Sequence, residues 1–124
     1  MSAKMTLPGD SRRFVEEAFA DRSLLESAPH KSAILMAVHQ LDEGAHRVAT
    51  PPEKSGGEWT VNAWLKQAIL LYFALRKMEK LEVGPFEYFD KIPLKRNLEA
   101  AGVRVVPPGV VRYGAFLERG VIVM

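Results

Sequence analysis

Apolar and polar residues alternate at helical intervals in two stretches near the start of the chain. The first stretch predicts a helix that Asp10 or Ser11 caps, since their side-chain oxygens accept hydrogen bonds from first-turn amides, and that ends near Asp21. The second predicts a helix that starts around residues 27–29, where proline is tolerated, and stops at Gly44 in a left-handed turn. We expect their buried faces to consist of Phe14, Val15, Ala18 and Phe19 in the first helix and of Ile34, Leu35, Val38 and Leu41 in the second.

A third stretch predicts the strongest helix, over residues 62–79, with Asn62 as its cap. Apolar residues cover so broad an arc of this helix that we expect burial on most sides and a central position in the fold. The basic residues near its end suit the negative end of the helix dipole; they are Arg76, Lys77 and Lys80. Before this helix, short extended segments at 47–49 and 58–61 flank a loop rich in proline and glycine, which predicts a small hairpin.

After the third helix the pattern predicts shorter elements. Gly84-Pro85 stops the helix, and residues 86–93 predict an aromatic-rich, extended connector. Residues 94–101 predict one short helix closed by Gly102, and residues 103–106 predict an apolar strand.

Val110, Phe116 and Ile122 recur at a spacing of six near the end of the chain. This is the period of hexapeptide repeats, in which each short strand of a parallel β-helix points one apolar residue inward. One coil buries its inner face only against a neighbouring coil, so the pattern predicts a β-helix cut short at residue 124. The expected fold class is α+β: a mainly helical domain with a short hairpin over residues 1–108, then the start of a β-helix domain over residues 109–124.

The composition of the chain indicates its number of domains and its cellular compartment. The chain has 124 residues, 48% of them apolar, which suits one domain with its own core. It contains no cysteine, which excludes disulfides and thiolate zinc sites and fits a reducing compartment. Its start lacks the apolar run of a signal peptide, and its longest apolar stretch, residues 68–75, is too short to span a bilayer. We therefore expect a cytoplasmic protein that has no membrane partner.

Basic residues gather at the end of the chain. Residues 91–124 hold six Lys/Arg against two Asp/Glu, whereas residues 1–90 hold 11 against 13. Such an end can receive phosphate, carboxylate or nucleic acid, or it can be a solvated surface. Dense basic stripes and known nucleic-acid modules are missing, and the aromatics of residues 86–89 are explained by packing, so we expect no nucleic-acid partner.

Signatures of a metal site or a nucleophile are also missing. His39 and His46 are seven residues apart, not on one helical face, so we interpret them and His30 as ordinary surface histidines and expect no metal. The chain has no Gly-x-Ser-x-Gly motif and no glycine-rich phosphate loop, and Gly56-Gly57 suits a hairpin turn. We expect no catalytic residue within this chain.

Arg104 is the exception in the apolar strand 103–106. A partly buried guanidinium needs an anionic partner, because it stays charged and its fork matches a carboxylate. That partner is either an anionic ligand or a structural ion-pair residue such as Glu99 or Asp90. On spacing alone, the structural ion pair is the favoured interpretation.

Several separated blocks extend from about residue 30 to the end of the chain. In order they are Leu41-Asp42-Glu43-Gly44, Arg47-Val48-Ala49, Trp64-Leu65-Lys66-Gln67-Ala68, Tyr88-Phe89-Asp90-Lys91-Ile92-Pro93, Arg104-Val105-Val106-Pro107-Pro108 and Gly114-Ala115-Phe116. In this order they resemble the N-terminal part of tetrahydrodipicolinate N-succinyltransferases. The resemblance implies transfer of succinyl from succinyl-CoA to the amino group of a ring-opened cyclic dicarboxylate, in lysine and diaminopimelate biosynthesis. It implies a helical N-terminal domain, a left-handed parallel β-helix and a homotrimer.

The resemblance also implies roles for three residues. Arg104 matches the family's substrate-binding arginine, which favours the ligand as its partner, while Lys91 and Lys95 lie in matching blocks and have only their charge to support them. Succinyl-CoA would be a co-substrate, and no cofactor would be held by this chain. Two departures are Arg96, where an aromatic residue is expected, and a family pattern that continues past Met124, so this chain alone would be inactive. The alternative is a non-catalytic helical assembly module of the same fold.

Overall fold

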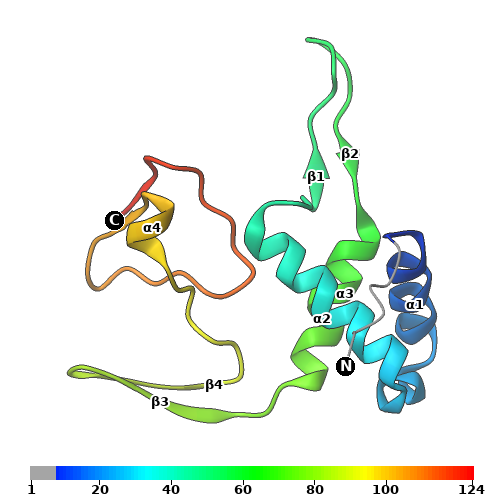
Figure 1. Ribbon diagram of the computed structural model, residues 1–124, viewed down its shortest axis with the longest axis horizontal. Helices are drawn as coiled ribbons and strands as arrows, with labels where there is room; N and C mark the ends of the chain where they lie inside the picture. Colours follow the sequence, from blue (N-terminus) through cyan, green and yellow to red (C-terminus); the bar gives the residue numbers. More distant parts are fainter. Residues whose placement is uncertain (1–7) are drawn as a thin grey trace.

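The computed structural model describes residues 8–124 and contains three packed helices (Figure 1). α1 (Pro8–Ala20), α2 (Ala28–Glu43) and α3 (Ala63–Leu75) each contact the other two, and we call them the helical bundle. A 3₁₀ helix, η1 (Arg22–Glu26), joins α1 to α2 and is capped by the side chain of Asp21. The buried core of the bundle consists of Val15, Ala18, Ala33, Ile34, Ala37, Val38, Leu41, Leu65, Ala68, Leu71, Tyr72 and Ile92.

The faces that α1 and α2 bury match the prediction except at Phe19 and Leu35. These two side chains are 37% and 48% exposed, whereas Ala33 and Ala37 of α2, which the prediction does not include, are fully buried. Small side chains let helix backbones approach closely, so larger residues beside the buried faces stay in solvent. α1 also begins at Pro8, which places Asp10 and Ser11 inside its first turn, so the prediction that either one caps the helix is wrong.

α3 is shorter than predicted. It ends at Leu75 instead of residue 79, since Arg76 has extended backbone angles and donates from its Nε to the carbonyl of Lys91 (3.0 Å). Lys77 and Lys80 consequently lie beyond the helix. Burial on most sides is confirmed, since α3 packs against both other helices and its exposed residues lie on one stripe, which includes Leu70 at 40% exposure.

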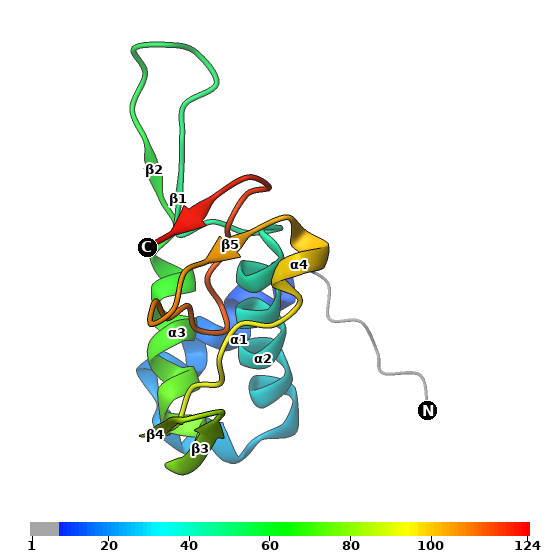
Figure 2. The ribbon, with the colours of Figure 1, turned by 90° about the vertical axis from the view of Figure 1, so that its left-hand side faces the viewer.

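The predicted hairpin before α3 is confirmed. β1 (Ala49–Thr50) and β2 (Thr60–Val61) pair antiparallel, and their loop extends away from the body of the protein (Figures 1 and 2). Asn62 occupies the cap position of α3 but makes no capping bond. Its side-chain amide donates to the carbonyl of Arg47 (2.7 Å) and to Oγ1 of Thr50, and so ties the hairpin together at its base.

A second hairpin follows α3. β3 (Glu79–Val83) pairs antiparallel with β4 (Phe86–Asp90), and Gly84-Pro85 form the turn between them. The predicted extended connector over residues 86–93 is thus confirmed where it forms β4. β3 is not predicted, because the alternation of Leu81 and Val83 with Lys80 and Glu82 is too short to distinguish a strand from an extension of the helix.

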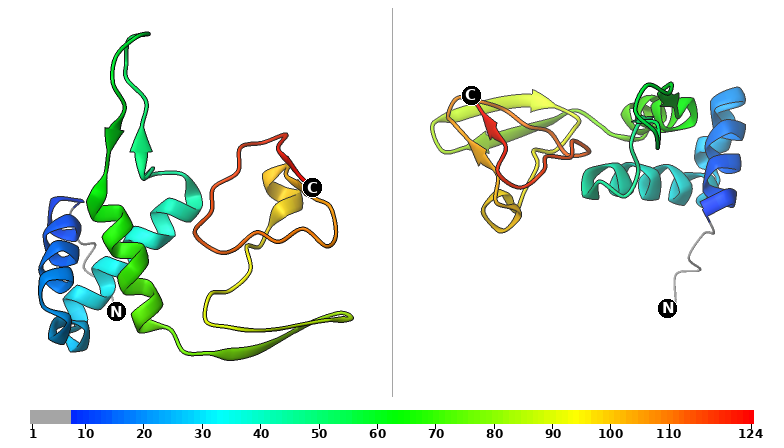
Figure 3. Two further views of the ribbon diagram at one scale, coloured as in Figure 1. Left: turned by 180° about the vertical axis from the view of Figure 1, so that it is seen from behind. Right: turned by 90° about the horizontal axis from the view of Figure 1, so that it is seen from above.

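Residues 93–124, which we call the C-terminal segment, make one broad turn beside the helical bundle (Figure 3). The predicted short helix is reduced to α4 (Leu98–Ala101), and Gly102 closes it in a left-handed conformation as predicted. β5 (Arg104–Val105) pairs parallel with β6 (Ile122–Val123), which begins 18 residues later. The predicted boundary at residue 108 and the β-helix itself stay predictions.

The three apolar residues that recur at a spacing of six are exposed in this structure. The exposed fractions are 49% for Val110, 37% for Phe116 and 54% for Ile122. None of them lies in a closed core of the C-terminal segment. Within residues 8–124, no helix has the length and apolar character needed to cross a membrane.

Candidate functional site

Arg104 is the first residue of β5, and its side chain is exposed. Its backbone N–H donates to the carbonyl of Val121 (3.0 Å), which fixes the strand while leaving the guanidinium free to turn outward. Among residues 8–124 the guanidinium makes no ion pair, neither with Glu99 nor with Asp90. The prediction of a partly buried arginine with a structural partner is therefore wrong, since Asp90 lies instead beside Arg112 (3.8 Å).

Lys91 follows β4 and lies against the end of α3. Its Nζ donates to the carbonyl of Phe73 (3.3 Å), and its own carbonyl accepts from Nε of Arg76 (3.0 Å). The last carbonyls of a helix have no partner within the helix, so an ammonium group at this place satisfies one of them. Lys91 thus joins the second hairpin to α3.

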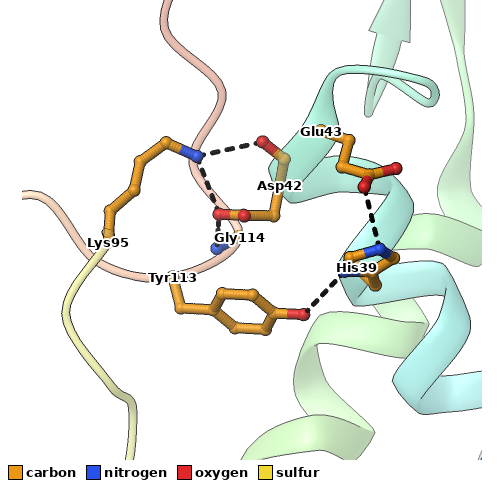
Figure 4. A network of polar contacts seen from close by, with 6 residues as sticks. All are labelled: His39, Asp42, Glu43, Lys95, Tyr113 and Gly114. Carbon is orange, nitrogen blue, oxygen red and sulfur yellow. Dashed lines mark hydrogen bonds and ion pairs between the residues drawn. The ribbon is translucent and has the colours of Figure 1, made fainter. Parts of the chain in front are cut away.

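Lys95 is held much more tightly, by Asp42 at the end of α2 (Figure 4). Its Nζ donates to Oδ1 of Asp42 (2.8 Å) and to the carbonyl of the same residue (3.0 Å). Oδ1 of Asp42 also accepts from the backbone N–H of Gly114 (2.8 Å). Within the described residues, no hydrogen bond or ion pair links Arg104, Lys91 and Lys95 to one another.

Tyr113 lies beside this group of contacts. Its phenol oxygen is 3.4 Å from Nδ1 of His39, whose Nε2 lies 2.9 Å from Oε1 of Glu43 (Figure 4). Burial raises the pKa of the Tyr113 phenol, and Asp42, Tyr72 and Glu43 raise it further, because a phenolate would face negative charge. The phenol therefore stays protonated and available as a hydrogen-bond donor at neutral pH.

Two hollows flank Tyr113. One, of about 440 Å³, opens beside the network of Figure 4 and is lined by His39, Asp42, Tyr72, Pro93, Leu94, Arg96, Asn97 and Tyr113. The other, of about 230 Å³, is more apolar and lies between α2, α3 and residues 112–115. Neither hollow is lined by a serine, threonine, cysteine or lysine side chain, and the larger one is lined by His39 and Tyr113.

The histidines do not form a metal site. The prediction that His30 is a surface residue is wrong, since it is buried with Nδ1 2.8 Å from Oγ of Ser27 and Nε2 2.8 Å from Oε2 of Glu17. His46 packs edge-on against Trp64. Across residues 8–124, no group of three or more potential metal ligands comes together.

Sequence reasoning missed Asp42 as a residue that organises this region. A signal was present, because Asp42 and Glu43 place two carboxylates at the negative end of α2, where acidic groups are disfavoured. Such a placement indicates that a cation from elsewhere in the chain approaches the helix end. Which cation does so could not be read from the sequence, since Lys95 is 53 residues away.

Comparison with known proteins places the chain in a family. Residues 10–75, just over half of the chain, match the family model described as "Tetrahydrodipicolinate N-succinyltransferase N-terminal". The chain belongs to this family. The resemblance seen in the sequence blocks is thereby confirmed.

Relatives of the chain carry the same enzyme name. The chain is 42% identical over 121 residues to the 2,3,4,5-tetrahydropyridine-2,6-dicarboxylate N-succinyltransferase of Alkalilimnicola ehrlichii, covering 90% of this chain and 43% of the relative. It is 42% identical over 127 residues to the protein of that name from Nitrosococcus oceani, covering 93% and 45%. The corresponding protein of Aeromonas hydrophila is 40% identical over 123 residues, covering 91% and 44%. The chain thus spans less than half the length of these relatives.

Proposed function

We propose that this chain is the N-terminal part of an acyltransferase that moves succinyl from succinyl-CoA to the amino group of ring-opened tetrahydrodipicolinate. The reaction belongs to lysine and diaminopimelate biosynthesis, and we place it in the cytoplasm. The observation that carries this proposal is the 42% identity over nine tenths of the chain with a succinyltransferase of that substrate. This chain would hold no cofactor, and succinyl-CoA would be a co-substrate of the whole enzyme.

The proposal includes the architecture of the whole enzyme. Parallel pairing of β5 with β6 at a separation of 18 residues corresponds to three hexapeptides, which supports one coil of a left-handed β-helix. A following coil would pair with the free edge of β6 and cover the exposed apolar residues at 110 and 122. We propose a homotrimer, with the active sites between neighbouring β-helices.

Arg104 is the substrate-binding residue in this proposal. Its exposed guanidinium lacks an ion pair among residues 8–124, so it can take a carboxylate of the substrate in a two-pronged hydrogen bond. Lys91 and Lys95 rank behind it, because their ammonium groups already bond to Phe73 and Asp42. We therefore expect each lysine to contribute less than Arg104 to binding of the substrate.

This chain is required to orient the substrate rather than to supply reactive groups. The deprotonated amine attacks the thioester carbonyl, a C–N bond forms, the C–S bond breaks, and coenzyme A leaves as the thiol with the proton that the amine loses. Direct transfer needs no acyl-enzyme, which suits a chain without a nucleophile signature. Holding the substrate carboxylate fixes the amine near the thioester, and such orientation accounts for a large share of the rate of bimolecular reactions.

A chimera tests the proposal. Residues 1–124 are joined to the remaining C-terminal part of the Alkalilimnicola ehrlichii relative, and release of free thiol from succinyl-CoA is followed with the dicarboxylate present. We expect the chimera to release thiol and Arg104→Gln to raise its KM for the dicarboxylate about tenfold or more, since a bidentate charged contact is lost. Arg22→Gln, on exposed η1, is the matched control and should leave both kinetic constants unchanged.

Three outcomes would contradict the proposal. A folded but inactive chimera would favour the non-catalytic assembly module, and an Arg104→Gln chimera with unchanged KM would remove Arg104 from the site. Thiol release by residues 1–124 alone would show that the remaining part of the enzyme is not needed.

A further inference from the structure

α2 ends with a local electrostatic conflict. Asp42 and Glu43 lie in its last turn, which holds no basic residue, so two carboxylates face the negative end of the helix dipole. The N–H groups of Gly44 and His46 bond to the carbonyls of Leu41 and Gln40, and His39 pairs with Glu43, which leaves Asp42 without a partner from α2 or the turn that follows it. A helix that ends in this way needs donors and positive charge from outside itself.

The C-terminal segment supplies both. The ammonium of Lys95 bonds to the carboxylate and to the carbonyl of Asp42, and the N–H of Gly114 bonds to the same carboxylate oxygen. Figure 4 shows the two donors approaching Asp42 from different parts of the chain. The side chains of Lys95 and Asp42 are 8% and 20% exposed, which makes this the most buried ion pair among residues 8–124.

The two donors belong to segments of the chain that hydrogen-bond to each other. The N–H of Lys95 donates to the carbonyl of Val111 (2.9 Å), and the N–H of Tyr113 donates to the carbonyl of Pro93 (2.8 Å). One carboxylate on α2 therefore holds both sides of a hydrogen-bonded pair.

Arg104 lies in the stretch of chain between Lys95 and Gly114, and further hydrogen bonds fix β5 within the C-terminal segment. The N–H of Val103 donates to the carbonyl of Leu98 in α4, and the N–H of Arg104 donates to the carbonyl of Val121. The N–H of Gly120 donates to the carbonyl of Gly102 (2.8 Å). The place where the C-terminal segment attaches to the helical bundle therefore determines where β5 presents the guanidinium.

We propose that Asp42 is a positioning residue, which fixes the C-terminal segment on the helical bundle and so sets the location of Arg104 for the substrate carboxylate. Asp42 itself touches no substrate. The functional half of this inference rests on the proposed function, whereas the structural half does not.

Hydrogen exchange on residues 1–124 tests the structural half. Asp42→Asn keeps the shape of the side chain but removes its charge and turns one acceptor into a donor. We expect backbone amides of residues 93–114 to exchange roughly tenfold faster or more, while those of α1 are unchanged. Lys95→Met, which keeps the apolar stem, should reproduce the effect, and Glu16→Gln, an exposed carboxylate on α1, should not. Unchanged exchange in both Asp42→Asn and Lys95→Met overturns the proposal.

Kinetics of the chimera test the functional half. We expect Asp42→Asn to raise KM for the dicarboxylate several-fold while KM for succinyl-CoA stays constant, a split that general destabilisation would not produce. In an Arg104→Gln background the same change should have little further effect, since the two residues act through one contact. Additive effects, or a change in both KM values, would overturn the link to Arg104. If the chimera is inactive with all residues intact, the proposed function fails, and the exchange experiment still decides the structural half.

Discussion

Tyr113 lies where the C-terminal segment meets the helical bundle, and this position changes its acidity. Its ring packs beside Tyr72, with 6.2 Å between centroids, and its phenol oxygen approaches His39. Burial is the largest cause of its raised pKa, followed by Asp42, Tyr72 and Glu43. The folded protein therefore keeps the phenolic proton to a higher pH than the unfolded chain does.

The sign of the resulting pH dependence follows from linkage. Between the ordinary pKa of 10.0 and the raised pKa, the unfolded chain has lost the proton that the folded protein keeps, so stability falls as the pH rises through this window. We expect ultraviolet titration to show one phenolate forming above pH 10.0, and Tyr113→Phe to remove that transition together with part of the alkaline loss of stability. If Tyr113→Phe instead removed a transition at or below the ordinary pKa of 10.0, the raised pKa would not belong to Tyr113.

At the scale of elements, α1 and α2 are joined by a polar contact within otherwise apolar packing. His30, near the start of α2, bonds to Glu17 of α1 and to Ser27 at the helix cap position. Its side chain is 10% exposed, and its ring meets Phe14 edge-on at 4.9 Å. Both ring nitrogens are satisfied, so the burial of this polar side chain carries no desolvation penalty from an unpaired group.

Replacing this histidine should loosen the pairing of the two helices. We expect His30→Ala to lower the free energy of unfolding by about 2 kcal/mol, because it removes two hydrogen bonds and leaves Oε2 of Glu17 without the imidazole that contacts it. Arg12→Ala, which breaks an exposed ion pair on α1, should cost less than about 0.5 kcal/mol. Urea unfolding followed by circular dichroism measures both, and equal effects would show that burial adds nothing at His30.

Elements with local signals were the ones that the sequence allowed us to predict. Proline in the first turn and Gly44 at the end placed α2 correctly, and the proline- and glycine-rich loop placed the first hairpin. β3 was missed because its residues become a strand only through pairing with β4, across the turn at Gly84. Pairing between segments is a tertiary effect that propensity does not contain.

The candidate site was predictable only in part. Arg104 was found from its sequence block, whereas the expectation of a structural partner failed because spacing does not fix where a side chain of a short strand points. The contact of Lys95 with Asp42 was missed, since it depends on how the C-terminal segment folds back onto α2. Long-range placement of this kind requires coordinates.

At the scale of the whole molecule, a second contact attaches the C-terminal segment to the bundle. The ring of Phe116 lies against Gly44, and the guanidinium of Arg47 lies 4.4 Å from the centre of that ring. Arg47 also reaches Glu118 at 3.5 Å. The end of α2 therefore receives the C-terminal segment at two neighbouring places.

Gly44 makes the second contact possible, and its replacement tests it. A Cβ at this position would lie 2.7 Å from the Phe116 ring, and its backbone has φ +80°. Gly56 has a similar φ of +87° but nothing within 4 Å, so Gly56→Ala measures backbone strain alone. We expect Gly44→Ala to be more destabilising than Gly56→Ala by about 1–3 kcal/mol in urea unfolding, since the ring must move. Equal losses would mean that the ring adapts without penalty.

The parallel pairing of β5 with β6 fixes the register of Arg104 opposite Ile122. A single residue added or deleted within either strand would turn each later side chain of that strand to the opposite face. The projecting tip at residues 51–57 obeys no such constraint, because both ends of that loop are tied at its base. Insertions and deletions among related sequences should therefore occur at residues 51–57 and be rare within β5 and β6.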